Sequence, residues 1–203
     1  QPIMLKKTLL VAFTILFCVA TQAQDKQKSV KPFRIGFKVG VPNIVGGNAE
    51  LVLFKRIAVY ADYSAYSGTF DQVEAGFNHF EIGGNIYFNP TGKGFYASLG
   101  YSNFSLDGTY TDAQTIGGID FTGTATGNVT LNTINAKLGL KLGRTFYMRT
   151  EVGYGFGTIP DKVIITGDVN GVTQTGEEAI PNIPGISSSG LLIFNIGFGF
   201  GFL

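Results

Sequence analysis

The chain of 203 residues is long enough for one domain and short for two. It contains 29 glycines, 18 phenylalanines and 9 tyrosines, whereas charged residues make up only 14%, against roughly a quarter in soluble domains. This composition favours strands and tight turns. The net charge of +1 provides no clustered basic face, so we expect no nucleic-acid partner.

The N-terminus has the three parts of a secretory signal peptide. Lys6 and Lys7 precede an apolar run from Leu9 to Ala20, and Ala23 is the small residue after which we expect cleavage. The run is shorter than the roughly 20 residues of a membrane-spanning helix. We therefore interpret residues 1–23 as a signal peptide, with residues 1–3 before the start methionine as an artefact. Residues 24–32 form a flexible lead-in, and residues 33–203 form the folded domain.

From Phe33 onwards, large apolar residues alternate with small or polar ones in eight segments, which we expect to be strands. The expected strands are residues 33–41, 49–53, 57–66, 80–88, 95–102, 134–142, 146–156 and 192–203. The expected connections alternate in length and are Pro42 to Gly47, Lys55-Arg56, Ser67 to Asn78, Asn89 to Gly94, Asp107 to Gly127, Gly143-Arg144 and Thr158 to Gly190. The last connection contains an expected hairpin from Lys162 to Gln174, with its turn at Asp168 to Gly171.

The final segment has the clearest pattern. Its apolar face consists of Leu192, Phe194, Ile196, Phe198, Phe200 and Phe202. At roughly 3.3 Å per residue, this face covers about 20 Å or more, which suits contact with lipid. The opposite face is nearly bare, with Asn195 and glycines 197, 199 and 201, and we expect it to leave room for Arg34 and Lys38 of the first strand.

The strand count, the alternating loop lengths and the lipid-like face together predict the fold. We expect an all-β protein, a closed eight-stranded antiparallel up-and-down transmembrane β-barrel with short periplasmic turns and long extracellular loops. Because every backbone polar group must pair in lipid, the first strand should meet the last. Phe and Tyr residues near both ends of the strands should form two aromatic girdles.

The chain resembles the small eight-stranded outer-membrane barrels of Gram-negative bacteria, the OmpA and OmpX type. The resemblance covers Phe33 to Leu203 and includes the terminal Phe198-x-Phe200-x-Phe202, which is similar to the aromatic signal read by the outer-membrane assembly machinery. It implies location in the outer membrane and contact with outer-membrane lipid and lipopolysaccharide. It does not imply a particular function, because one fold supports many functions.

The inward phase of the strands collects charges of both signs. The expected lumen charge network consists of Arg34, Lys38, Glu50, Asp62, Glu81, Lys137, Lys141, Arg149 and Glu151. A barrel of eight strands is only just wide enough for its own side chains, and buried charges must be paired. We therefore expect a salt-bridge plug, and a narrow polar pathway is the alternative.

His79 is the only histidine, and its phase points inward, two positions from Glu81. Ser64 and Asp62 on the neighbouring strand could complete a hydrolase-like set, but the spacing is unspecific, and we expect a structural histidine. One histidine and a lone cysteine inside the signal segment also predict no metal site and no cofactor.

These observations favour a non-enzymatic outer-membrane protein with a structural or surface-interaction role. The barrel would act as an anchor, and the long loops would contact an extracellular ligand. Two alternatives remain open: a lipid-modifying enzyme with His79 at its centre, and a narrow pore for ions or small solutes.

Overall fold

The computed structural model describes residues 30–70, 73–111, 114–116, 119–121, 124–160, 162–169, 172–179 and 186–202. The expected signal peptide and residues 24–29 of the lead-in lie outside these ranges. No helix in the described part of the chain is long and apolar enough to cross a membrane.

Eight long strands form a closed antiparallel barrel, which confirms the predicted fold class. They are β1 (Phe33–Val41), β2 (Ile44–Phe54), β3 (Ile57–Phe70), β4 (Val73–Tyr87), β5 (Gly94–Thr111), β8 (Thr124–Gly143), β9 (Phe146–Phe156) and β13 (Gly190–Phe202). Consecutive members of this set pair with each other, and β13 pairs with β1 from Phe33↔Phe202 to Val41↔Phe194. The first and last strands therefore meet, and the barrel has no open seam along their paired length.

Side chains alternate between the two faces of each barrel strand, as strand geometry requires. In β13, Phe194 and Phe200 are exposed on the outside, whereas Asn195 is buried inside. Aromatic residues are exposed near both ends of the outer surface. One belt contains Phe33, Phe54, Phe88, Phe95, Phe146 and Phe202, and the other contains Tyr63, Tyr66, Phe80, Tyr101 and Phe156, with Tyr154 half-buried.

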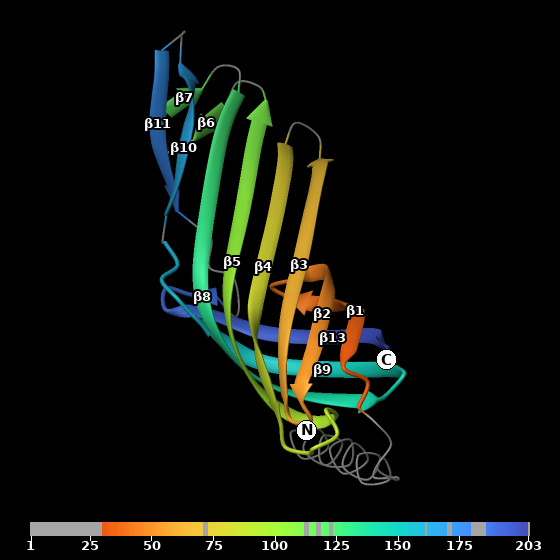
Figure 1. The fold of residues 1–203 in the computed structure, drawn as a ribbon. Helices are drawn as coiled ribbons and strands as arrows, with labels where there is room; N and C mark the ends of the chain where they lie inside the picture. Colours follow the sequence, from red (N-terminus) through yellow and green to blue (C-terminus); the bar gives the residue numbers. More distant parts are fainter. Residues whose placement is uncertain are drawn as a thin grey trace, which may run out of the picture.

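The two ends of the barrel differ in height. At one end, here called the turn end, short connections at residues 55–56, 88–93 and 144–145 join the strands. At the other, here called the tall end, β3, β4, β5 and β8 rise past β1, β2, β9 and β13 (Figure 1). β2 pairs with β3 only as far as Gly47↔Tyr63, and β9 pairs with β8 only as far as Phe156↔Ile134. The extensions form a wall on one side of the mouth.

The observed strands correct three expected loops, two of them in the wall. Most of the predicted loop from Ser67 to Asn78 is strand, because β3 and β4 stay in register to Phe70↔Val73. Most of the predicted loop from Asp107 to Gly127 is also strand, because β5 and β8 pair to Thr111↔Thr124. β2 begins at Ile44, so the Pro42 to Gly47 loop shrinks to a turn at residues 42–43. Threonine, tyrosine and glycine can all extend a hairpin whose backbone hydrogen bonds are already aligned. The local composition of such a segment therefore does not show where the strand ends.

Five short strands belong to the connections at the tall end: β6 (Gln114–Ile116), β7 (Ile119–Phe121), β10 (Lys162–Val169), β11 (Val172–Ala179) and β12 (Ile186–Ser187). β10 and β11 confirm the predicted hairpin and extend it to Ala179. Residues 170–171 of its expected turn lie outside the described ranges. β10 also pairs with β8 from Ile164↔Asn128 to Gly167↔Ala125, so this hairpin widens the wall.

Candidate functional site

The lumen contains all nine charged residues of the sequence-predicted network. Each is buried, and all come from β1, β2, β3, β4, β8 and β9: Arg34, Lys38, Glu50, Asp62, Glu81, Lys137, Lys141, Arg149 and Glu151. Four carboxylates thus face five cations. Each of the nine lies within 4.0 Å of at least one opposite charge, which is how buried charges become tolerable.

Glu50 is the centre of a cluster towards the turn end. Its carboxylate accepts hydrogen bonds from Arg34 Nη1 at 2.5 Å and from Lys141 Nζ at 2.6 and 2.7 Å. Tyr87 Oη at 2.9 Å and Asn85 Nδ2 at 2.8 Å donate two more. These donors come from β1, β4 and β8, so this one carboxylate ties together strands on different sides of the barrel.

A second cluster fills the middle of the lumen. Asp62 accepts a hydrogen bond from Lys38 and lies 3.5 Å from Arg149 Nη2. Glu151 lies 3.6 Å from Lys38 Nζ and 3.9 Å from Arg149 Nη1. Because Lys38 and Arg149 each contact both carboxylates, four residues from three strands form one closed set of ion pairs.

Lys137 connects this cluster to Glu81. Lys137 Nζ donates to Glu81 Oε1 at 2.7 Å and lies 3.9 Å from Glu151. Pairing across the lumen leaves little of the charge unbalanced. The arrangement is chemically suited to holding strands together.

Inward tyrosines, which the sequence reasoning left out of the network, complete it. Tyr96 donates to Glu151 at 2.8 Å, Tyr60 donates to Glu81, and Tyr87 donates to Glu50. Their rings also fill the space above inward glycines: a Cβ at Gly139 would lie 2.2 Å from Tyr96 Cζ. The alternation phase already placed these tyrosines inside, and that was the available signal.

The glycines of β13 accommodate different neighbours from those expected. A Cβ at Gly199 would lie 2.5 Å from Tyr147 Oη, and a Cβ at Gly197 would lie 3.2 Å from the Arg149 side chain. Tyr147 and Arg149 belong to β9. The room was predicted for Arg34 and Lys38, but the side chains that crowd these glycines come from the other neighbouring strand.

His79 lies above the charged layers, opposite Ser64 in the β3–β4 register. Both side chains are buried, and neither the two ring nitrogens of His79 nor Ser64 Oγ has a hydrogen-bond partner. Asp62, the third member of the hydrolase-like set, is engaged by Lys38, Asn48 and Arg149. Phe104 packs edge-on to the imidazole, with ring centroids 6.5 Å apart.

From the level of Phe104 upwards, the inner face of the wall becomes apolar. Register pairs place these residues in transverse rows across β4, β5, β8 and β10. One row is Phe77, Leu106 and Val129, the next is Ala75, Gly108, Gly127 and Ile165, and Phe104 pairs with Leu131 below them. Buried Ile159, Leu191 and Ile193 pack with Leu131 on the opposite side. Sequence reasoning missed this change because it assigned most of these positions to loops.

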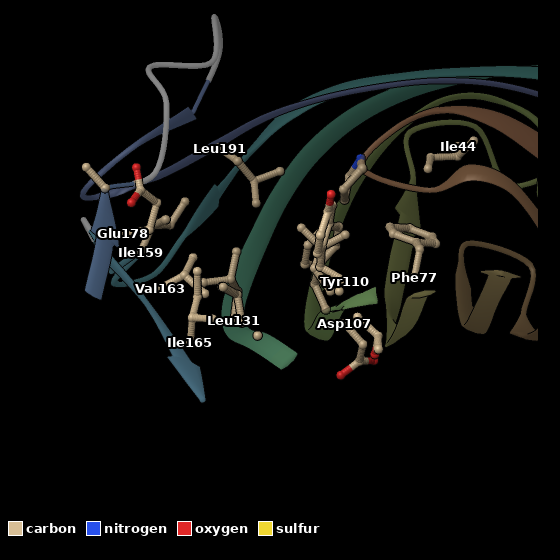
Figure 2. A pocket seen from close by; sticks show the side chains of 18 of the residues that line it. Ile44, Phe77, Asp107, Tyr110, Leu131, Ile159, Val163, Ile165, Glu178 and Leu191 are labelled. Carbon is tan, nitrogen blue, oxygen red and sulfur yellow. The ribbon is translucent and has the colours of Figure 1, made fainter. Parts of the chain in front are cut away.

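These surfaces enclose a cavity of about 650 Å³, here called the basin. Figure 2 shows its side chains from several elements, with Val163, Ile165 and Leu131 gathered near β8 and β10, and Ile159 and Leu191 above them. Val41, Pro42 and Ile44 at the β1–β2 turn complete the lining. The basin is therefore an apolar chamber at the tall end, with the paired charges of the lumen below it.

Among the described residues, no group of three or more His, Cys, Asp and Glu side chains is placed to hold a metal ion.

No family model matches the chain, and no curated protein matches it. Among solved structures, it is similar to CarO2 of Acinetobacter baumannii, with 13% identity and a TM-score of 0.46 over 87% of this chain and 100% of that chain. It is also similar to CarO of the same organism, with 13% identity and a TM-score of 0.48 over 84% of this chain and 98% of that chain. Likeness at these values carries no argument about function, which has to come from the geometry of the barrel.

Proposed function

We propose that the protein is an outer-membrane β-barrel that anchors a tall extracellular wall used for surface interaction. The outer face supports a membrane location, because an apolar band lies between two belts of exposed aromatic residues on a barrel without open strand edges along its paired length. In this orientation the turn end is periplasmic. The outer surface contacts lipid and lipopolysaccharide, and the outward phenylalanines of β13 are read by the assembly machinery.

Fractionation of cells that express the full chain tests the location. We expect the protein in the outer-membrane fraction, with faster migration in unboiled than in boiled dodecyl sulfate samples, because a closed barrel resists the detergent until heated. Recovery in the soluble fraction would contradict the proposal.

The plugged lumen favours an anchor over a pore. The two clusters around Glu50 and Asp62 engage side chains from most of the barrel strands and leave each carboxylate in contact with a cation. Planar bilayers containing the protein should remain silent. Current steps whose ion selectivity changes with Lys38→Met would support the pore alternative.

The observation that carries the surface-interaction role is the height of the wall. Within the described residues, β3 has no strand partner on its β2 side beyond Tyr63, so its stretch from Ser64 to Phe70 is an edge. An extended segment of a partner can add to such an edge through backbone hydrogen bonds. The rigid barrel below would hold this edge at a fixed height above the membrane.

A hairpin deletion tests this role. Residues 67–76 are replaced by an Asn-Gly turn, which keeps the Tyr66↔Phe77 pair as the last rung. In the matched control, residues 162–179 are removed, which takes away the β10–β11 hairpin and leaves the β3 edge intact. We expect loss of cell adhesion to protein-coated surfaces, and of cell–cell aggregation, in the first variant only. Unchanged adhesion with correctly folded protein would refute the proposal.

We propose a non-enzymatic role for His79. Catalysis of the hydrolase type requires a hydrogen-bonded nucleophile and base, whereas the His79 nitrogens and Ser64 Oγ have no partners and Asp62 is held by cations. His79→Gln should leave the lipid A and phospholipid profiles of whole membranes unchanged. A changed lipid profile in this variant would support the alternative of a lipid-modifying enzyme.

A further inference from the structure

The basin differs from the lower lumen in how its space is filled. Below, tyrosine rings occupy the room above inward glycines, as Tyr96 does at Gly139. In the basin, a Cβ at Gly108 would have no atom within 4 Å, although Gly108 lies on the inner face beside Gly127. The side chains of the described residues therefore leave this chamber empty, while apolar groups line it.

We infer that the basin is a binding site for a small aliphatic molecule whose head group is neutral or cationic. A volume of about 650 Å³ lies within the range of roughly 300–1,000 Å³ that is typical of ligand pockets. Leu106 and Val163 on its lining are only partly covered, and burial of such apolar surface is the main source of affinity for a hydrocarbon chain. The paired charges of the lumen lie below the basin, so the apolar lining ends there.

The head-group preference comes from Glu178 on the lining. Glu178 pairs with Val163 across β10 and β11, so both side chains lie on the basin side of the hairpin. Asp107 is the other charged residue of the lining, and its carboxylate accepts a hydrogen bond from Asn128 at the outer surface. The Glu178 carboxylate on the basin side repels an anionic head group and favours an ammonium or hydroxyl group, whereas the Asp107 carboxylate lies on the other face of the wall.

The test uses the full chain in lipid nanodiscs with ¹³C-labelled leucine methyl groups. Leu131 and Leu191 report on the basin, whereas Leu99 and Leu138, exposed on the outer face, report on probe dissolved in the lipid. Decan-1-ol, decylammonium and decyl sulfate are titrated separately. We expect the two basin methyls to shift saturably with the alcohol and the ammonium, and the two outer methyls to shift only in proportion to added probe.

Two variants separate binding from partitioning. Gly108→Phe fills the chamber and should weaken saturable binding at least about tenfold, whereas Gly47→Phe adds the same ring to the outer face and should not. Decyl sulfate should bind the wild-type protein at least about tenfold more weakly than decylammonium. Glu178→Gln should reduce this difference in affinity between the two probes.

The head-group comparison needs only the wild-type protein, so it stands even if Gly108→Phe fails to fold. Basin methyls that shift in proportion to added probe, like the outer ones, would overturn the inference. Decyl sulfate that binds as tightly as decylammonium would overturn the assignment of the head group.

Discussion

Glu50 provides the most direct test of the lumen network, through its replacement by glutamine. The substitution keeps the shape and removes one negative charge. In the folded protein, this charge is shared by Arg34 at 2.5 Å and Lys141 at 2.6 Å, and all three side chains are almost fully buried. Tyr87 and Asn85 donate to the same carboxylate. Two buried cations therefore lose their nearest acidic partner in one step.

The expected loss of folding free energy follows from that burial. Removal of one partner from a buried ion pair costs about 3–5 kcal/mol, because the remaining charge stays desolvated without compensation. The remaining amide oxygen can still accept from one donor, so the lower half of this range is the expectation. If the guanidinium m-value is about 4 kcal/mol/M, the unfolding midpoint should fall by about 1 M.

Guanidinium unfolding of the protein in lipid vesicles, followed by far-ultraviolet circular dichroism, measures this loss. The matched control is Glu177→Gln on the β10–β11 hairpin, where the ion pair with Lys162 has side chains 59% and 62% exposed. Water screens that pair, so the control should change the midpoint very little. Lys141→Met added to Glu50→Gln should recover part of the stability, because one orphaned cation is then removed. Equal midpoints for Glu50→Gln and Glu177→Gln would refute the idea that the network holds the barrel together.

Two further substitutions test the outer face and the glycine packing in the same assay. Leu138→Arg places a charge between the two aromatic belts and should lower the free energy of unfolding by about 2–4 kcal/mol. Val172 on β11 is equally exposed, at 61% against 60% for Leu138, but it faces water, so Val172→Arg should lower it little. Equal losses in the two variants would contradict the membrane orientation. Gly139→Ala forces the buried Tyr96 ring to move and should lower the free energy of unfolding by about 1–3 kcal/mol. Gly47→Ala should not lower it, because the nearest atom to the added Cβ is 4.0 Å away. An unchanged stability of Gly139→Ala would show that the lumen packing is loose.

Much of the barrel could be predicted from alternation because one period fixes the face of every residue in a strand. Glu151 and Arg149 could be placed inside by counting from Phe146, and β9 begins and ends where the pattern does. Strand ends were less predictable. β3 continues through Ser67 and Gly68 because β4 continues beside it, and that mutual pairing is a property of two segments together.

The sequence by itself determined the fold class, the inward set of charges and the lipid-like outer face, since each depends on local periodicity. The tertiary structure alone decided which charges meet, that Tyr147 and Arg149 crowd the β13 glycines, and that Phe77, Phe104 and Leu131 line one chamber. Strand stagger and closure bring residues that are far apart in the chain to the same height inside the barrel. The sequence of one strand does not determine that height, because it depends on how the strand is staggered against its neighbours.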